Sequence, residues 1–227
     1  MSCSEKRERD MRSTIKAVLF DFGGVLADEG FYEGLLATGR KNGLDPEAFF
    51  RTVDSLIYET GYLIGLSDEA SFWSAVREQT GIVGSDDELR QEILTRFVIR
   101  PKMLAVVDGL RAQGSIVAML SDQTNWLEEL NRAAALFRRF DRIFNSFTIR
   151  KSKRDATVFT DVCEALGVRP EETLFVDDNI NHIRRAQGRG LHTIHFTGSD
   201  DFEEQLKTFA VARAVRKQTV SAPNGPE

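Results

Sequence analysis

Short apolar runs alternate with helix-like patterns along most of the chain. Three of the runs are continuous and strongly apolar, and they cover residues 16–21, 115–120 and 173–177. Two weaker runs lie at residues 142–147 and 191–196. Continuous apolar runs of this length are typical of strands that are buried on both faces of a parallel sheet. We therefore predict five strands.

Between the later runs, apolar residues recur at the spacing of an amphipathic helix. The expected helices cover residues 102–113, 124–136, 155–167, 180–189 and 200–210. Glycines follow three of the periodic stretches, at positions 114, 167 and 190, where the left-handed turn that ends a helix favours glycine. Strands that alternate with helices in this way predict an α/β fold with a doubly wound, Rossmann-like parallel sheet.

The segment from residue 28 to residue 100 follows a different pattern, because it carries helical periodicity without a buried strand. Its expected helices cover residues 31–42, 46–59, 67–80 and 86–97. Pro46 follows Asp45, and acids follow Ser67, as is common where helices begin. We expect an all-helical cap domain at 28–100, inserted into a core domain. The core would comprise residues 15–27 and 101–210, between flexible tails at 1–14 and 211–227.

Composition and charge narrow the range of functions. The 227 residues are 41% hydrophobic and 29% charged, which is ordinary for a globular protein. A net charge of −5 gives no general attraction to nucleic acid or to an anionic membrane. Two cysteines, a polar amino-terminal segment and the lack of a long apolar stretch favour a cytoplasmic protein without disulfides. We expect a small-molecule substrate as its partner, and the sequence leaves the oligomeric state open.

Polar side chains gather where three of the predicted strands end. Asp21 ends the first strand, Ser121 and Asp122 follow the second, and the segment 177–179, Asp-Asp-Asn, follows a later one. The carboxyl ends of parallel strands meet at one edge of the sheet, where open α/β sheets bind ligands. Acids this close together repel one another unless a cation compensates them, which implies a hard divalent metal such as Mg²⁺. The alternative is that each acid merely caps the following helix.

Four motifs in this order resemble those of the haloacid dehalogenase-like (HAD) hydrolase superfamily. They are Phe-Asp-Phe-Gly-Gly-Val-Leu at 20–26, Leu-Ser-Asp at 120–122, Lys153 with the helix after it, and Phe-Val-Asp-Asp-Asn at 175–179. The similarity extends over most of residues 15–210 and is to the helical-cap branch, subfamily I. The resemblance implies that the strand carrying the fourth motif lies beside the first strand, which would bring Asp178 next to Asp21.

The resemblance also implies roles for individual residues. Asp21 would be the nucleophile that attacks a phosphoryl group and forms an aspartyl-phosphate. Asp178 would be the principal metal carboxylate, with Asp177 beside it and the Gly23 carbonyl as a further ligand. Ser121, Asp122 and Lys153 would bind the phosphoryl group. The spacing to the next helix favours Lys153 over Lys151, and a solvated basic loop is the alternative.

Gly23 departs from the pattern of most phosphatases of the superfamily, in which a second Asp at this position protonates the leaving group. Glycine has no proton to donate, and positioned acid–base catalysis contributes roughly 10²- to 10⁴-fold in rate. Low activity is therefore expected. Asp28, or Glu29 next to it, is a candidate to replace the missing acid, and an ordinary linker carboxylate is the alternative.

Three functions remain in contention at this point. The first is a Mg²⁺-dependent phosphatase that acts on a small phosphorylated metabolite. The second is a dehalogenase-type hydrolase with an Asp nucleophile, which the adjacent acids Asp177 and Asp178 disfavour because its chemistry needs no metal. The third is a catalytically weak module that binds metal and phosphate and interacts with a partner.

Overall fold

The structure is a computed structural model, which describes residues 14–209 and residue 211. Most of the two expected tails, 1–14 and 211–227, lies outside the described residues. Where the two ends of the described chain meet, Ile15 and Val211 form an isolated parallel bridge.

A five-stranded parallel sheet lies at the centre of the molecule, in the order β3-β2-β1-β4-β5. The strands cover β1 Ala17–Phe20, β2 Ile116–Ser121, β3 Arg142–Asn145, β4 Thr173–Asp177 and β5 His192–His195. All five strands and the α/β fold class that the sequence predicted are confirmed. β1 pairs with both β2 and β4, so the strand that carries Asp177 lies beside the strand that leads to Asp21.

Helices cover both faces of the sheet. They are α6 Pro101–Ala112, α7 Trp126–Ala134, α8 Ser146–Ile149, α9 Thr157–Leu166, α10 Ile180–Gln187 and α11 Ser199–Leu206. Successive residues of a strand point to opposite faces. Val18 and Phe20 of β1 therefore share an apolar cluster with residues of α6 and α11. Ala17 and Leu19 belong to the opposite cluster, which contains residues of α9 and α10.

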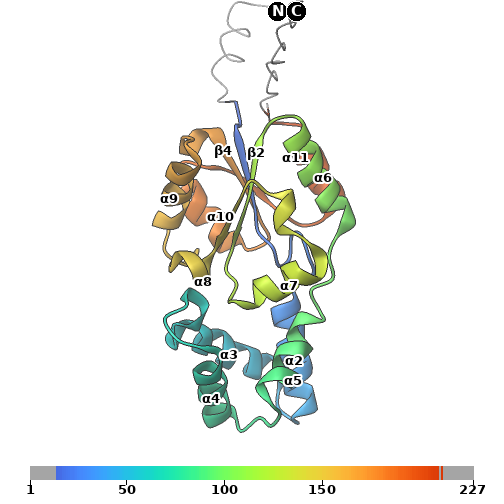
Figure 1. The fold of residues 1–227 in the computed structure, drawn as a ribbon, viewed down its shortest axis with the longest axis vertical. Coiled ribbons are helices and arrows are strands. Elements are labelled where there is room, and N and C mark those ends of the chain that lie inside the picture. The colour runs from blue at the N-terminus through green and yellow to red at the C-terminus, as the bar shows by residue number, and fades with distance from the viewer. Residues whose placement is uncertain (1–13, 210, 212–227) are drawn as a thin grey trace, which may run out of the picture.

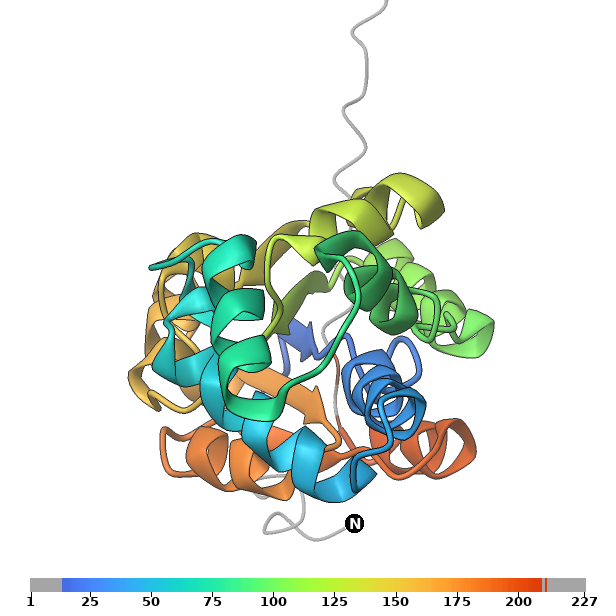
Figure 2. The ribbon, with the colours of Figure 1, turned by 90° about the horizontal axis from the view of Figure 1, so that it is seen from below.

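A helical region follows β1 and lies against the carboxyl end of the sheet (Figures 1 and 2). It contains α2 Gly30–Lys41, α3 Pro46–Glu59, η1 Tyr62–Ile64, α4 Glu69–Thr80 and α5 Asp86–Leu94. The four expected helices are present here. None of the helices among the described residues combines the length and the apolar character that crossing a membrane requires.

The last helix of this region ends earlier than the sequence predicted, at Leu94 instead of residue 97. The chain turns there, and the ring of Phe97 packs against Phe22 with 5.3 Å between ring centroids. The Asp28 backbone N–H then donates to the Val98 carbonyl at 2.9 Å, and the Arg100 N–H donates to the Leu26 carbonyl at 2.9 Å. The two chain segments that join the helical region to the sheet are thus bonded to each other.

Several short elements were not predicted from the sequence. They are α8 and the 3-10 helices η1, η2 Phe137–Arg139 and η3 Pro170–Glu172. Each of them is only one turn long, and a single turn shows too few residues for an apolar period to be recognised. Of these elements, η1 and α8 lie against each other, and the Ser146 hydroxyl donates to the Leu63 carbonyl at 3.0 Å.

Candidate active site

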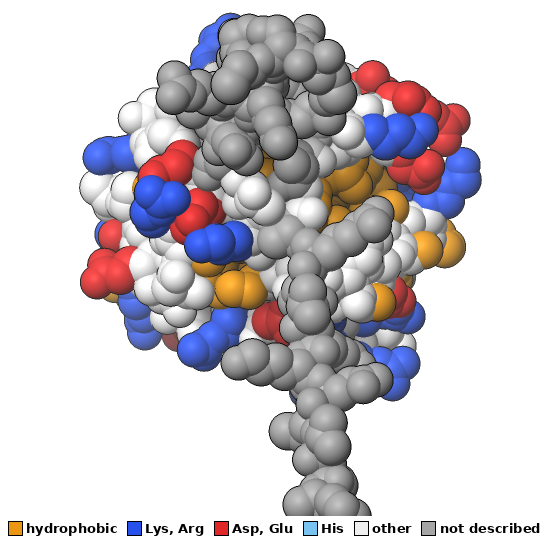
Figure 3. Space-filling model, turned by 90° about the horizontal axis from the view of Figure 1, so that it is seen from above, with side chains coloured by type: hydrophobic (Ala, Val, Ile, Leu, Met, Phe, Trp, Pro, Cys, Tyr) orange, Lys and Arg blue, Asp and Glu red, His pale blue; other side chains and the backbone are white. Residues whose placement is uncertain are grey.

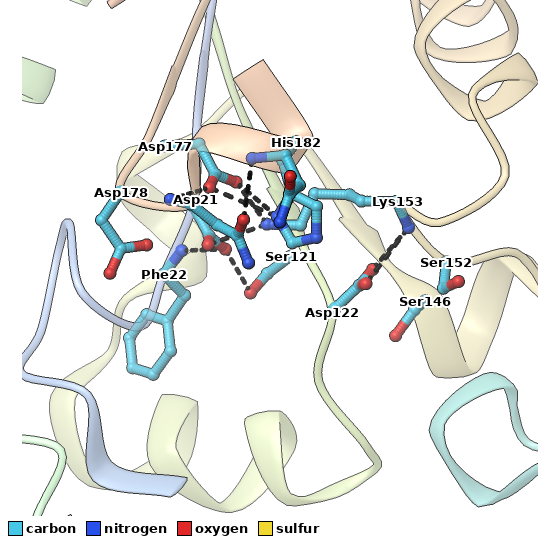
Figure 4. A network of polar contacts seen from close by, with 12 residues as sticks. Asp21, Phe22, Ser121, Asp122, Ser146, Ser152, Lys153, Asp177, Asp178 and His182 are labelled. Carbon is cyan, nitrogen blue, oxygen red and sulfur yellow. Dashed lines mark hydrogen bonds and ion pairs between the residues drawn. The ribbon is translucent and has the colours of Figure 1, made fainter. Parts of the chain in front are cut away.

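Strand β1 delivers Asp21 to the carboxyl edge of the sheet. The Asp21 backbone N–H donates to the Val176 carbonyl of β4 at 2.9 Å, which continues the parallel pairing by one residue. One carboxylate oxygen, Oδ1, accepts hydrogen bonds from the Phe22 N–H at 2.7 Å and from the Ser121 hydroxyl at 2.9 Å (Figure 4). These two contacts fix the orientation of the carboxylate.

Lys153 lies fully inside the site, with 1% of its side chain exposed, between two carboxylates. Its Nζ is 2.7 Å from Asp21 Oδ2 and 2.6 Å from Asp177 Oδ2. Burial disfavours the ammonium form, but attraction by Asp177 and Asp21 outweighs burial and holds the pKa of Lys153 above its usual range. Lys151, the other lysine of this loop, pairs instead with Asp161. The structure therefore brings Lys153, and not Lys151, to Asp21.

Asp122 holds the loop that carries Lys153. The Lys153 backbone N–H donates to both oxygens of the Asp122 carboxylate, at 2.9 and 3.1 Å. Burial raises the pKa of Asp122 above its usual value. In this contact the Asp122 carboxylate orients the Lys153 loop, and the predicted part of Asp122 in binding a phosphoryl group stays a prediction.

Asp177 and Asp178 end β4 beside Asp21. The Asp177 carboxylate is buried and accepts the Asn179 N–H at 2.7 Å, while His182 Nδ1 lies 3.3 Å from it. Burial favours its neutral form, but attraction by Lys153 and the contact with His182 dominate and hold the pKa of Asp177 below its usual range. The pKa of Asp178 is raised, first by burial and then by the neighbouring Asp177 carboxylate.

Carboxylate oxygens of Asp21, Asp177 and Asp178 lie within 4.8 Å of one another. Burial, together with repulsion by Asp177 and Asp178, raises the pKa of Asp21 well above its usual value, although Lys153 opposes this shift. Three buried or half-buried oxygen donors that repel one another suit a hard divalent cation such as Mg²⁺. Gly24 leaves room for this cluster, since a Cβ there would lie 2.0 Å from Asp178 Oδ2. The residues therefore fit a magnesium site.

A cavity of about 300 Å³ opens above these groups, between the sheet edge and the helical region. Its floor is polar and contains Asp21, Ser121 and Lys153. The helical region contributes the aromatic residues Phe31, Tyr32, Phe50 and Tyr58 to its lining, and α7 contributes Trp126. Other aromatic residues of the helical region, Phe49, Phe72 and Trp73, are buried in the apolar core instead.

The two candidate replacements for an acid at position 23 lie in different surroundings. The Asp28 side chain is half exposed and accepts hydrogen bonds from Arg100, with its Oδ1 3.1 Å from Nη2 and 3.2 Å from Nε. Asp28 is absent from the lining of the cavity, whereas Glu29 belongs to it. Burial of the Glu29 carboxyl, followed by repulsion from Asp178, raises the pKa of Glu29 to about 7.

The sequence patterns gave no indication of His182. It lies in the first turn of α10, directly after the acids that end β4, and it lines the cavity. One signal could have indicated it: His182 lies in the first turn of the helix that follows a polar strand end. Residues in such a turn lie near the same edge of the sheet. His195 was equally unremarkable in the sequence, yet its Nε2–H donates to the Asp178 carbonyl at 2.8 Å.

Comparison with known proteins identifies the class. Residues 15–188 match the haloacid dehalogenase-like hydrolase family, and the chain belongs to this family of hydrolases. It is 26% identical to sesquiterpene phosphatase astK of Aspergillus oryzae, over 83% of this chain and 93% of that protein. It is 24% identical to (S)-2-haloacid dehalogenase 4A of Burkholderia cepacia, over 81% of this chain and 84% of the other.

Among solved structures, the chain resembles a HAD family enzyme of Bacteroides thetaiotaomicron in complex with magnesium and inorganic phosphate. The two share 27% identity with a TM-score of 0.64, over 79% of this chain and 93% of that one. The superfamily that the four motifs suggested is thus confirmed, whereas assignment to the helical-cap subfamily stays a prediction. The relatives include both phosphatases and dehalogenases, so the comparisons leave the choice between these two reactions open.

Proposed function

We propose that the protein is a Mg²⁺-dependent phosphatase that hydrolyses a small phosphate monoester through an aspartyl-phosphate on Asp21. The observation that carries the proposal is the position of Lys153 Nζ, 2.7 Å from Asp21 Oδ2 and 2.6 Å from Asp177 Oδ2. A buried ammonium next to the attacking carboxylate can neutralise both the nucleophile and a phosphoryl group that approaches it. Its neighbour Ser121 offers a hydroxyl to a phosphoryl oxygen.

The proposed first step uses Asp21 as the nucleophile. One of its oxygens attacks phosphorus, the bond from phosphorus to the alcohol oxygen breaks, and an aspartyl-phosphate forms. Water then attacks this phosphorus and regenerates the Asp21 carboxylate. Ser121 and Lys153 hold the phosphoryl oxygens during both steps, while the Asp122 carboxylate keeps the Lys153 loop in position.

The magnesium ion would be held by carboxylate oxygens of Asp21 and Asp178 and by the Gly23 carbonyl, with Asp177 next to them. When bound, it supplies positive charge that stabilises the negative charge on the phosphoryl group. The mutual approach of three carboxylates within 4.8 Å supports this part of the proposal, because such a cluster gains from a cation. The relative from Bacteroides thetaiotaomicron, solved with magnesium and inorganic phosphate, supports it independently.

The cavity indicates the general form of the substrate. A volume of about 300 Å³ suits a small metabolite, and the aromatic residues in the lining suit an organic group with an apolar face. The relative named as a sesquiterpene phosphatase is in keeping with such a group. We therefore propose a monoester of a small, largely apolar alcohol in preference to a highly polar one.

Steady-state hydrolysis of 4-nitrophenyl phosphate tests the proposal. The wild-type protein should release phosphate with Mg²⁺ and lose this activity in EDTA, because the cluster of acids would repel the substrate without the cation. Asp21→Asn should reduce turnover by at least about 10³-fold, as expected when a covalent nucleophile is lost. Glu164→Gln, a change on the surface of α9, serves as the matched control and should retain full activity.

The same preparation should be offered a short 2-haloacid, with released halide as the readout. Halide release that depends on Asp21 and needs no Mg²⁺, together with inert phosphate esters, would replace the phosphatase proposal with the dehalogenase reaction. Equal inertness of wild type and Asp21→Asn towards both substrate classes would favour a module that binds metal and phosphate without turnover.

A further inference from the structure

We propose that Glu29 is the catalytic acid and base of this site and that its carboxyl replaces the side chain missing at position 23. The inference rests on the proposed phosphatase function, for which such a group would protonate the leaving alcohol. The Glu29 carboxyl fills the volume that a side chain at position 23 would need.

The overlap of these two positions is direct. A Cβ built on Gly23 would lie 2.6 Å from Glu29 Oε2 and 3.4 Å from its Cδ. The distance to Oε2 is much shorter than van der Waals contact, so a side chain at position 23 would require the Glu29 carboxyl to leave its present position. Because residue 23 is a glycine, the sheet edge has no side chain at this point. The Glu29 carboxyl occupies the space instead.

The turn between β1 and α2 holds Glu29 in this position. Arg100 closes the turn, because its guanidinium donates to the Gly24 carbonyl and to the Asp28 carboxylate. Glu29 then forms the N-cap of α2, and its carbonyl accepts the Glu33 N–H at 3.1 Å. From this fixed backbone the Glu29 side chain reaches the cavity that contains Asp21 and Asp178.

Asp28, the neighbouring acid, is engaged differently. Its carboxylate faces Arg100 and its side chain is half exposed, so it belongs to the frame of the turn. The two adjacent acids thus differ in position: Asp28 anchors the turn, and Glu29 lines the cavity that contains Asp21.

In the proposed catalytic cycle, the Glu29 carboxyl is protonated at the start. As Asp21 attacks phosphorus and the bond to the alcohol oxygen breaks, the Glu29 carboxyl donates its proton to that oxygen and the alcohol leaves. The resulting Glu29 carboxylate then accepts a proton from the water that attacks the aspartyl-phosphate. Phosphate leaves, the Asp21 carboxylate is restored, and Glu29 again carries the proton.

The test compares Glu29→Gln with the wild type on two esters, 4-nitrophenyl phosphate and a simple alkyl phosphate. Nitrophenolate leaves without a proton, so kcat/KM for the aryl ester should be unchanged, since it reports only the steps up to alcohol release. For the alkyl ester, kcat/KM should fall by about 10²- to 10⁴-fold. Loss of the base in the second step should also make Glu29→Gln release one equivalent of nitrophenolate in a burst and accumulate the aspartyl-phosphate.

Two further variants make the test specific. Glu33→Gln alters an exposed acid one turn further along α2 and should behave as the wild type on both esters. Glu29→Ala empties the volume beside Gly23, so combining it with Gly23→Asp should return alkyl-ester turnover that Glu29→Ala alone has lost. Recovery by a carboxyl on a different residue supports a chemical role, because a purely structural defect would remain.

The outcomes separate this inference from the proposed function. If Glu29→Gln lowers both kcat/KM values by the same factor, or changes neither, the role of Glu29 is overturned while Asp21-dependent hydrolysis stands. A wild type that hydrolyses neither ester overturns the phosphatase proposal and this inference with it.

Discussion

Gly23 and Gly24 lie two and three residues after Asp21, and a side chain at either position would collide with a carboxylate. At Gly23 the carboxylate is that of Glu29, 2.6 Å from the position of a Cβ, and at Gly24 it is that of Asp178, at 2.0 Å. Gly24 also has a φ of +74°, a left-handed conformation that favours glycine. The first glycine makes room for the proposed acid, and the second makes room for the proposed metal ligand.

We predict that Gly24→Ala weakens Mg²⁺ binding by about 10- to 100-fold, the loss typical when the groups that orient a metal ligand are disturbed. The new methyl group would push the Asp178 carboxylate away from Asp21. The measurement is isothermal titration of the purified variant with MgCl₂.

Gly43→Ala is the matched control for this prediction. Gly43 has a similar φ of +69°, but nothing lies within 4 Å of the position of its Cβ. Both variants should lose roughly 1–2 kcal/mol of stability, the cost of a left-handed backbone with a Cβ. Unchanged Mg²⁺ affinity in Gly24→Ala would show that Asp178 does not contribute to metal binding in the way proposed. An equal loss of Mg²⁺ affinity in Gly24→Ala and Gly43→Ala would show the same.

At the scale of elements, the helical region depends on a close contact between α2 and α5. A Cβ on Gly34 would lie 2.6 Å from the Ile93 Cα and 3.1 Å from the Glu92 carbonyl oxygen, both of which are backbone atoms. Backbone cannot move aside as a flexible side chain can. Glycine at this point therefore sets the distance between the helix that begins after Glu29 and the last helix before the chain returns to the sheet.

We predict that Gly34→Ala destabilises the protein by about 1–3 kcal/mol, the usual cost of overpacking a core, although alanine favours a helix. Gly109→Ala should do the opposite. Gly109 lies inside α6, where nothing is within 4 Å of a Cβ, so the variant should gain roughly 0.5–1 kcal/mol from helix propensity. Urea denaturation at one pH measures both free energies of unfolding. A gain in stability for both variants would contradict the close contact between α2 and α5.

The lengths of the elements and the contacts of single residues explain how much of this fold was predictable. The strands and long helices follow from apolar periods that extend over several turns, so five strands and the helices on both sides were found. Lys153 could be chosen over Lys151 by counting from the next helix, although no pattern could indicate that Asp122 would hold its backbone. The end of α5 was missed because Phe97 continues the apolar pattern but leaves the helix to pack on Phe22.

The positions of the Glu29 and His182 side chains could not be predicted from the sequence. Adjacent acids at positions 28 and 29 carry the same chemistry in the sequence, but in the structure Asp28 pairs with Arg100 and Glu29 lines the cavity. His182 reaches Asp177 through the first turn of a helix. Such choices depend on contacts between segments far apart in the chain, and a local pattern carries no information about them.

At the scale of the whole molecule, a polar sheet edge and aromatic side chains line one cavity. The proposed nucleophile Asp21, the proposed acid Glu29 and the buried Lys153 line that cavity, at the end of the sheet that the helical region covers (Figure 2). The opposite end carries basic and acidic side chains of both signs around its rim (Figure 3).

The covalent intermediate is the central claim, and mass spectrometry of the acid-quenched protein tests it most directly. The wild-type protein, mixed with Mg²⁺ and 4-nitrophenyl phosphate and quenched within one turnover, should carry one phosphoryl group on the peptide that contains Asp21. Hydroxylamine should remove it, as expected of an acyl phosphate, and Asp21→Asn should carry none. Rapid hydrolysis of the ester without a phosphorylated Asp21 peptide, or with equal labelling of Asp21→Asn, would contradict the account.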